Sequence, residues 1–434
     1  MSSEMKMKKG YVPKLRFPEF QNDVGWDIAT VGSKAIKVGS GITPKGGDKN
    51  YKKSGRPFIR SQNIGWGHLI LDDVAFIDDD THSTFSSTEI KANDVLLNIT
   101  GASIGRSAVA DSDIQGGNVN QHVCIIRTKK SELKPYFLNQ YLLSSDGQKQ
   151  IDSFQAGGNR QGLNFAQIRS FSFLLPSVKE QQKIADCLSS LDSMISLQTQ
   201  KIDALQQYKK GLMQKLFPTE GETVPELRFG GFQNEDAWHS LNLGSCLLKR
   251  PEYGVNAPAV PFSKELPTYL RITDIAENGS FIHEKKTSVA KSVTDSNYLR
   301  KGDIVLARTG ASVGKSYLYN EKDGALVFAG FLIRIRPDQK KLNSGFLFQY
   351  FKTEQYWKWV SLNSARSGQP GINGSEYSAL PIVLPSMQEQ QKIADCLSSL
   401  DELIVTETQK LGTLKNHKTG LMQQLFPAMD EVNA

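Results

Sequence analysis

The chain has 434 residues, more than one hydrophobic core usually organises, and this length predicts several folded units. Its 39% hydrophobic and 22% charged residues exclude wholesale disorder, and no stretch approaches the roughly 20 apolar residues of a membrane span. Lysine plus arginine (52) exceeds aspartate plus glutamate (45), and the net charge of +7 favours a polyanionic partner, although many basic proteins never bind nucleic acid.

The N-terminal segment predicts where the protein resides, and the cysteine spacing predicts whether it binds a metal. The basic start MSSEMKMKKG leads into YVPKLRFPEF without the apolar core of a signal peptide, so we expect a cytoplasmic protein with no membrane partner. Four cysteines (Cys124, Cys187, Cys246 and Cys396) lack C-x-x-C spacing, and the six histidines are scattered. We therefore expect free thiols and no bound metal.

The sequence contains an internal repeat. The opening VPKLRF at Val12 returns as VPELRF at Val224. The segment EQQKIADCLSSLD at residues 180–192 recurs identically at 389–401, an offset of 209 residues. The same offset relates TGAS at Thr100 to TGAS at Thr309, and LMQKLFP at Leu212 to LMQQLFP at Leu421. A duplication over nearly the whole chain predicts an internal pseudo-twofold repeat.

Between these landmarks lie two divergent inserts, residues 24–175 and 237–384, rich in short β-type runs and turn residues. Residues 94–99 and 303–307 are predicted strands that enter GASIGRS and GASVGKS. A phosphate-binding loop needs four residues between its glycines and a helix after them, whereas three residues and a β-type stretch occur here. The pattern instead predicts hairpins with unusual glycine backbone angles, at Gly101, Gly105, Gly310 and Gly314.

Each insert is followed by a long predicted helix. Ser177 and Ser386, each after a proline, begin Ser-x-x-Glu patterns typical of a capping box, and the next prolines are Pro218 and Pro427. Each helix can therefore run about 39 residues, about 58 Å.

Apolar residues on both helices alternate at spacings of four and three, which is typical of a coiled-coil seam. The seam residues are Ile184, Leu188, Leu191, Ile195, Gln198, Ile202, Leu205, Lys209, Leu212 and Leu216, and then Ile393, Leu397, Leu400, Ile404, Glu407, Leu411, Leu414, Lys418, Leu421 and Leu425. We expect the helices to pair antiparallel, in a register that sets Lys209 opposite Glu407 and Gln198 opposite Lys418. The alternative is two helices packed separately on their own domains.

Basic and amide side chains near glycine-rich turns are candidates for reading DNA. Arginine can pair with guanine, asparagine or glutamine with adenine, and lysine with phosphate. The candidates are Arg60, Gln62, Asn63, Arg106, Asn118, Gln121, Arg160 and Gln161 in the first insert, and Arg271, Thr273, Arg308, Lys315, Arg366 and Gln369 in the second. For each one, an ordinary turn residue or surface hydrogen bond is the alternative.

Motifs for catalysis are missing from the sequence. Neither an N-P-P-aromatic nor a D-P-P-Y segment for amino methylation occurs, and no glycine-rich cofactor loop is followed by an acidic residue. The E-x-K fragments at Glu132 and Glu284 are common in surface segments and do not indicate a nuclease. We therefore expect a non-enzymatic chain without a cofactor of its own.

Together, the twice-used LPS-x-x-EQQKIADCLSSLD, LMQ-x-LFP, VP-x-LRF and TGAS-x-G motifs resemble the DNA-specificity subunits of type I restriction-modification enzymes over nearly the whole chain. The resemblance implies a mixed α/β fold in which two globular target-recognition domains are joined by an antiparallel coiled coil. The implied segments are recognition domain 1 (1–176), the central helix (177–217), recognition domain 2 (218–385), the C-terminal helix (386–427) and a tail (428–434).

The same resemblance implies the partners. They are double-stranded DNA, two methyltransferase subunits that carry S-adenosylmethionine and make 6-methyladenine, and restriction/translocase subunits. Each domain would read one half of an asymmetric bipartite site, and the helices would set the spacer. Gln181, Lys183, Gln390 and Lys392 are candidate methyltransferase contacts, with an ordinary solvated helix face as the alternative.

Two other functions stay open at this stage. One is a self-contained duplicated methyltransferase or nuclease with an unrecognised active site, which would modify or cut DNA alone. The other is a structural adaptor that recruits proteins without contacting DNA, which would show no sequence preference.

Overall fold

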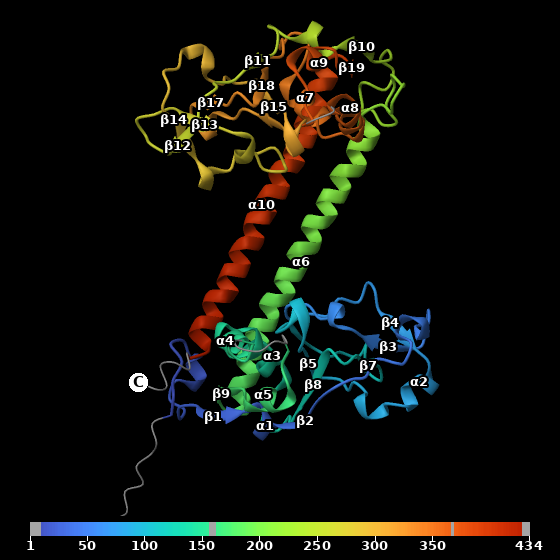
Figure 1. Cartoon of the computed structure of the whole chain (residues 1–434), viewed down its shortest axis with the longest axis vertical. Coiled ribbons are helices and arrows are strands. Elements are labelled where there is room, and N and C mark those ends of the chain that lie inside the picture. The colour runs from blue at the N-terminus through green and yellow to red at the C-terminus, as the bar shows by residue number, and fades with distance from the viewer. Residues whose placement is uncertain (1–9, 156–161, 366–368, 428–434) are drawn as a thin grey trace, which may run out of the picture. The chain divides into compact units, whose positions relative to one another are not determined.

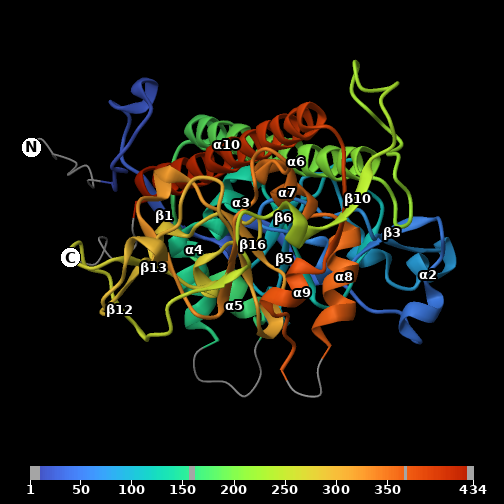
Figure 2. The same cartoon turned by 90° about the horizontal axis from the view of Figure 1, so that it is seen from above.

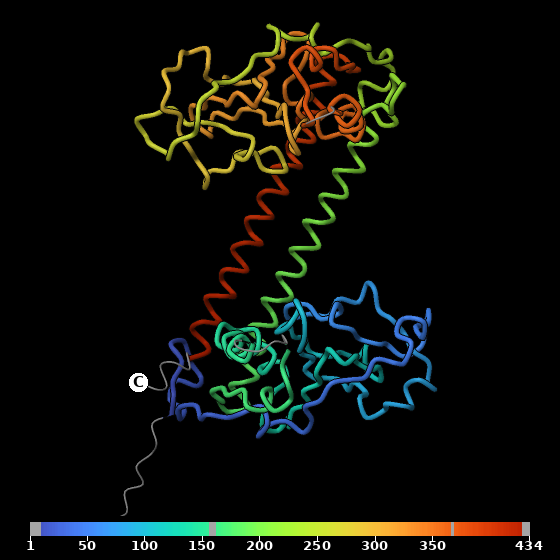
Figure 3. Tube along the Cα trace, in the orientation of Figure 1, coloured from blue at the N-terminus to red at the C-terminus, as the bar shows by residue number. Residues whose placement is uncertain are grey.

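The structure, a computed structural model, describes residues 10–155, 162–365 and 369–427. The chain forms two compact units: unit 1 comprises residues 1–199 and 409–434, and unit 2 comprises residues 200–408. Two helices of 39 residues, α6 (Val178–Leu216) and α10 (Met387–Leu425), each contribute one segment to each unit (Figure 1). The tube in Figure 3 follows both helices without interruption. Because the units divide the helices internally, the predicted limits of the five segments remain predictions.

Unit 1 contains three small sheets. The strand orders are β2–β8–β5–β6, β4–β3–β7 and β1–β9, and only the β3–β7 pairing among these named strands is parallel. The elements are β1 (Asp27–Thr30), α1 (Val31–Lys34), β2 (Ala35–Ser40), β3 (Arg56–Ile59), β4 (Ala75–Ile77), α2 (Asp79–Ser83), β5 (Val95–Asn98), β6 (Ser107–Val109), β7 (Asn118–Val119), β8 (Val123–Thr128), α3 (Pro135–Leu143), α4 (Ser145–Ser153), α5 (Phe165–Ser170) and β9 (Ser172–Leu175).

Unit 2 repeats this topology with one additional strand. Its strand orders are β11–β18–β15–β16, β12–β14–β13–β17 and β10–β19, and β13 pairs with β17 in parallel. The elements are β10 (His239–Asn242), β11 (Glu252–Tyr253), β12 (Ala259–Pro261), β13 (Thr268–Leu270), β14 (Thr287–Val289), β15 (Ile304–Ala307), β16 (Ser316–Leu318), β17 (Leu326–Phe328), β18 (Leu332–Ile335), α7 (Ser344–Tyr350), α8 (Glu354–Ser364), α9 (Gly374–Ser378) and β19 (Pro381–Leu384). The mixed α/β fold and the internal repeat are confirmed.

The central strand of each unit is buried on both faces. In β5, Val95 and Leu97 pack into the core that contains α3, while Leu96 packs into a second core with Ile59 of β3. Successive side chains of a strand point to opposite faces, so an uninterrupted apolar run places side chains in two cores, one on each face of the sheet. Strand β15 is likewise buried at every position, which explains why both strand predictions were correct.

The glycine-rich segments form hairpin loops, as predicted. Strands β5 and β6 pair antiparallel, as do β15 and β16. The φ angles are +73° at Gly101, +85° at Gly105, +76° at Gly310 and +88° at Gly314, a region that residues with a Cβ rarely adopt. The segments therefore are not phosphate-binding loops that open a helix.

The predicted capping boxes are only half formed. The Ser177 hydroxyl accepts from the Glu180 backbone amide, but the Glu180 carboxylate accepts from Arg16 at 2.8 Å and from the Trp26 indole at 3.2 Å instead of turning back. Unit 2 repeats the ion pair between Arg228 and Glu389. The arginines belong to the two VP-x-LRF openings, so the glutamates connect these segments to the helix starts.

The two helices pair antiparallel within each unit, where they lie side by side (Figure 1 and Figure 2). In unit 1, Lys418 of α10 bonds Asp192 of α6, and in unit 2, Lys209 of α6 bonds Asp401 of α10. Every predicted seam residue is buried or half-buried. The seam and the antiparallel pairing are confirmed, and separately packed helices are excluded. None of the helices in the described ranges is long and apolar enough to cross a membrane.

The predicted register was wrong. It set Lys209 opposite Glu407 and Gln198 opposite Lys418, whereas Lys209 bonds Asp401, Lys418 bonds Asp192, and Glu407 accepts from Lys201. Two seam lysines therefore bond aspartates that flank the seam, and not the polar seam residues that were predicted to lie opposite them. Leucine and isoleucine layers are compatible with several registers, so the charged side chains discriminate among them.

Candidate nucleic-acid interface

Three chain segments meet at the end of the central strand in each unit. In unit 2, the residue after β15, Arg308, bonds through its backbone to Phe331 before β18 and to Ile372 before α9. In unit 1, Ile99 after β5 bonds in the same way to His122 and Leu163. Each residue lies 209 positions from its counterpart. We call these two places the loop junctions, and they have matching backbones but different side chains.

The unit 2 loop junction presents a cation that lies against an aromatic ring. The Arg308 guanidinium carbon lies 4.8 Å from the centroid of the Tyr253 ring, and the neighbouring Phe331 is 61% exposed. The Tyr253 hydroxyl accepts from the Gly374 backbone amide. Within the described ranges no carboxylate pairs with Arg308. A guanidinium held against a ring and not neutralised can address guanine or phosphate.

The sequence-predicted Gln369 also reaches this loop junction. Its amide nitrogen lies 3.1 Å from the place that a Cβ on Gly310 would occupy, and its side chain is exposed. The fold therefore brings together Arg308 and Gln369, two candidates separated by 61 positions. Arg160, Gln161 and Arg366, predicted in the matching segments, lie outside the described residues.

The unit 1 loop junction presents amide and imidazole groups. The Thr100 hydroxyl and His122 Nδ1 lie 2.6 Å apart, and the exposed Gln121 amide lies 3.3 Å from His122 Nε2. Asn120 Oδ1 accepts from the His122 backbone amide. These groups can donate to and accept from base edges. Gln121 therefore remains a candidate, and the described groups around it differ from those around Arg308.

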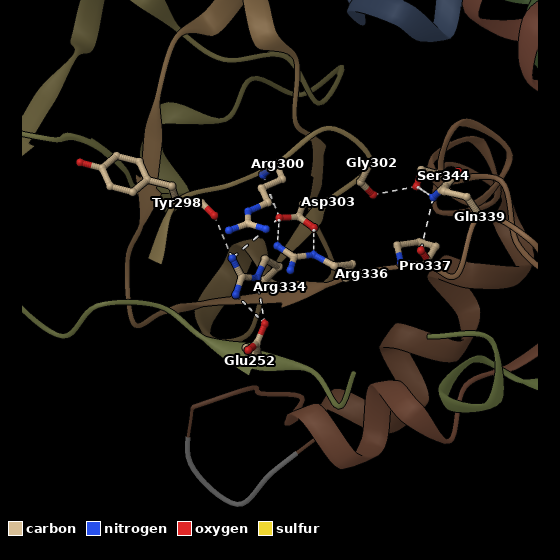
Figure 4. Close-up of polar contacts among 10 residues, drawn as sticks. All are labelled: Glu252, Tyr298, Arg300, Gly302, Asp303, Arg334, Arg336, Pro337, Gln339 and Ser344. Atoms are coloured by element: carbon tan, nitrogen blue, oxygen red, sulfur yellow. Dashed lines mark hydrogen bonds and ion pairs between the residues drawn. The ribbon is translucent and has the colours of Figure 1, made fainter. Parts of the chain in front are cut away.

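A polar network around Arg334 of β18 includes Glu252 of β11, the strand that pairs with β18 (Figure 4). Tyr253, the next residue of β11, lies against Arg308. Arg334 donates to Glu252 of β11 and to the Tyr298 carbonyl, while Arg336 donates to both oxygens of Asp303 at 2.6 and 2.8 Å. The hydrogen bonds to Asp303 raise the pKa of Arg336. Unit 1 retains the Arg127–Asp94 counterpart but has Ile125 where unit 2 has Arg334.

Several candidate side chains form hydrogen bonds or ion pairs within the protein. Asn63 and Asn118 are 1% and 0% exposed, and both side-chain amides bond neighbouring groups, including the Ile70 carbonyl and His82 respectively. These placements argue against base contacts. The remaining engaged candidates bond nearby carboxylates: Arg60 and Gln62 bond Asp73, Arg271 and Thr273 bond Asp274, and Lys315 bonds Glu277.

Arg60 and Arg271 have the same structural role in the two units, and they stand at matching places in the sequence. They begin the equivalent turns of FIRSQN and YLRITD, where the side chains of Asn63 and Asp274 accept from the arginine backbone amides. By contrast, the half-buried Arg106 guanidinium has no hydrogen bond or ion pair within the described ranges. Arg106 therefore remains a candidate.

The candidate partner surface is only partly exposed. Gln181 and Gln390 are 0% and 1% exposed, and their amides bond backbone groups such as the Lys134 and Asn343 amides, so they are not free to bind another chain. Lys183 is exposed and pairs with Glu19 at 2.9 Å. Lys392 is exposed and lies 6.0 Å from the Phe229 ring.

Sequence reasoning missed the aromatic and basic groups around the unit 2 loop junction. Tyr253 and Phe331 were not predicted, although each stands beside a glycine. The exposed Lys249 and Arg250 were also missed; they precede Pro251, which packs against Gly374. In the sequence, a basic pair is followed by a proline and then by a tyrosine, and this pattern could have identified the group. The four cysteines are free, and the described residues contain no cluster able to hold a metal.

The comparisons with known proteins agree with this arrangement. A family model for the type I restriction modification DNA specificity domain matches residues 26–207 and 264–416. The chain is 24% identical to the StySPI specificity subunit of Salmonella potsdam, covering 93% of this chain and 88% of that protein. It is 23% identical to the EcoKI specificity subunit of Escherichia coli, covering 85% and 80%.

The fold is also that of a solved protein. The crystal structure of the type I restriction-modification S subunit from M. genitalium superposes with a TM-score of 0.63 at 17% identity, covering 96% of this chain and 99% of that one. The family model alone covers more than half of the residues, once in each repeat. The chain therefore belongs to the type I restriction-modification DNA-specificity family.

Proposed function

We propose that this chain is the DNA-reading subunit of a type I restriction-modification complex, with one unit for each half of an asymmetric bipartite site. The observation that carries the proposal is the pair of loop junctions, where matching backbones present different chemistry. Arg308 and Phe331 stand in unit 2 where Ile99 and His122 stand in unit 1. Two equivalent catalytic sites would need the same polar groups, whereas two readers of unlike sequences need different ones.

The partners in this proposal are double-stranded DNA and two methyltransferase subunits, joined by restriction/translocase subunits in the full complex. S-adenosylmethionine would bind the methyltransferase, which would make 6-methyladenine, and this chain would supply sequence choice. The exposed Lys183 and Lys392 are the remaining candidate contacts for the methyltransferase. The α6–α10 pair would set the distance between half-sites.

A binding selection tests the proposal. The chain assembled with its methyltransferase is incubated with random-sequence duplex, and we expect enrichment of two unlike half-sites at one separation. Binding should weaken steeply with salt because phosphate contacts release counterions. Absence of any enriched sequence would support an adaptor instead. Methylation or cleavage by the chain alone, supplied with magnesium and S-adenosylmethionine, would support the self-contained enzyme.

A further inference from the structure

A half-buried aspartate joins three elements in unit 1. Asp192 of α6 accepts from Gln140 of α3 at 2.7 Å and from Lys418 of α10 at 2.6 Å. The Gln140 side chain is 2% exposed, and the Lys418 side chain is 13% exposed. We call Gln140, Asp192 and Lys418 polar clamp 1. It connects a helix of the recognition domain to both long helices.

Unit 2 contains the same arrangement, polar clamp 2. Asp401 of α10 accepts from Gln349 of α7 at 2.8 Å and from Lys209 of α6 at 2.6 Å. Each of these residues lies 209 positions from its counterpart in polar clamp 1. Lys352, which has no charged counterpart in unit 1, adds a third donor to Asp401 at 3.0 Å. The two glutamines lie in matching segments of the inserts, FLNQY at 137–141 and FLFQY at 346–350.

The energetics of these groups favour a single helix register. Apolar seam layers can exchange partners after a slip of one turn with little loss. A largely buried ammonium paired with a half-buried carboxylate cannot, because after the slip the ammonium has no carboxylate partner and keeps its desolvation cost. The glutamine extends this constraint to the recognition domain, because its amide bonds the aspartate from α3 in unit 1 and from α7 in unit 2.

We propose that the two polar clamps are positioning residues that restrict the half-site spacing accepted by the protein. They would do so by fixing each recognition domain to the helix pair at one axial position. The inference rests on the proposed function, in which the helices set the spacer. A slip of one helical turn is about 5.4 Å, and one base pair rises about 3.4 Å, so one turn corresponds to between one and two base pairs.

The test replaces polar clamp 1 with apolar side chains of similar size, Gln140→Met, Asp192→Leu and Lys418→Met together. Such replacement of a buried ion pair commonly preserves stability, so the variant should fold. The complex with the methyltransferase is given duplexes that carry the wild-type half-sites at spacings varied by single base pairs, and 6-methyladenine is sequenced. We expect methylation at the adjacent spacings, relative to the preferred one, to rise at least about tenfold.

The matched control is Gln182→Ala with Asp186→Ala. These residues form an exposed hydrogen-bonded pair on α6 and should leave the spacing preference unchanged. Gln140→Met alone keeps the Lys418–Asp192 pair and should broaden the spacing by about threefold, which covers the case in which the triple variant does not fold. A folded triple variant, or failing that a Gln140→Met variant, that keeps one spacing overturns the inference. A wild-type complex that modifies no bipartite site overturns the proposed function instead.

Discussion

At the residue scale, the feature of the unit 2 loop junction that makes it a candidate DNA contact is an arginine that lies against an aromatic ring and not against a carboxylate. Arg271 and Lys315 are neutralised by Asp274 and Glu277, whereas the Arg308 guanidinium lies against the Tyr253 ring. A cation in an ion pair must exchange its carboxylate for a DNA group before it can bind DNA, whereas a ring-supported guanidinium without a carboxylate already has its donors free. Pairing, rather than residue type, therefore distinguishes Arg308 from Arg271 and Lys315 as a candidate DNA contact.

Replacing Arg308 with alanine should relax recognition at one position of one half-site. A good bidentate arginine–guanine pair discriminates by about 1–3 kcal/mol, so we expect a loss of selectivity of about 10- to 100-fold there. Sequencing of 6-methyladenine in cells that carry the variant complex measures it. Lys340→Ala, at an exposed lysine beyond the opposite end of β18, is the control. Changes in both half-sites, or none, would contradict the assignment.

Lys352 adds a pH dependence that is specific to unit 2. Burial, and then the neighbouring Lys209, lower the pKa of Lys352 to about 8. The unfolded chain binds this proton up to about pH 10.4, so the free energy of unfolding should rise as pH increases from about 8 to about 10. Lys352→Leu introduces the residue found at the equivalent Leu143.

We expect Lys352→Leu to stabilise unit 2 at pH 7 by about 1–3 kcal/mol and to remove this rise, because no buried ammonium then needs to be desolvated. Urea unfolding at pH 7, 8, 9 and 10 measures both effects, with the exposed Lys340→Leu as control. Parallel pH profiles for wild type and Lys352→Leu would show that the charge at this position is not coupled to folding.

At the element scale, the starts of α6 and α10 are held by arginines from distant segments. Glu389 is 0% exposed and accepts from Arg228 at 2.6 and 2.9 Å, and the Leu227 amide donates to the Lys215 carbonyl near the end of α6. One short segment thus satisfies groups at the start of one helix and at the end of the other. The opening segments therefore stabilise the antiparallel pairing from the ends of the helices.

Glu389→Ala should destabilise unit 2 by about 3–5 kcal/mol, because it leaves the buried Arg228 guanidinium without its carboxylate. Glu402→Ala on the exposed face of α10 is the matched control and should change stability by less than about 0.5 kcal/mol. Chemical denaturation followed by circular dichroism measures both. Equal stabilities would mean that solvent replaces the lost carboxylate and that the ion pair does not hold the helix start.

At the scale of the whole molecule, two copies of one frame carry different readers. Sheets of matching strand order, matching helix-start ion pairs and matching polar clamps recur, while the loop junctions differ. Such a frame allows one reader to change without altering the other, because their cores are separate.

Exchange of residues 237–384 for the corresponding insert of another family member should therefore change one half-site and preserve the other half-site and the spacing. Methylome sequencing of cells carrying the chimera tests this. The informative chimera keeps Gln349, and with it polar clamp 2, and its control is a chimera that replaces Gln349 with leucine. Altered bases in both half-sites would show that the units do not read independently.

The sequence by itself determined the features that depend on local periodicity and repetition. The four-and-three spacing, the flanking prolines and the identical 13-residue segments were sufficient for two helices of the observed length and a buried seam. The positive-φ glycines after β5 and β15 were equally predictable, because their backbone requirement is local. The mixed fold followed from the duplicated motifs and their family resemblance.

Only the tertiary structure decided which polar groups are free and which are bound. Arg308 lies against Tyr253 while Arg271 pairs with Asp274, and Asp401 rather than Glu407 takes Lys209. Ion pairs and burial depend on side chains that lie far apart in the chain, and every register of the apolar seam has similar local patterning. Long-range charge pairing therefore distinguishes the observed register from the predicted one, and burial and pairing narrow the set of candidate DNA contacts.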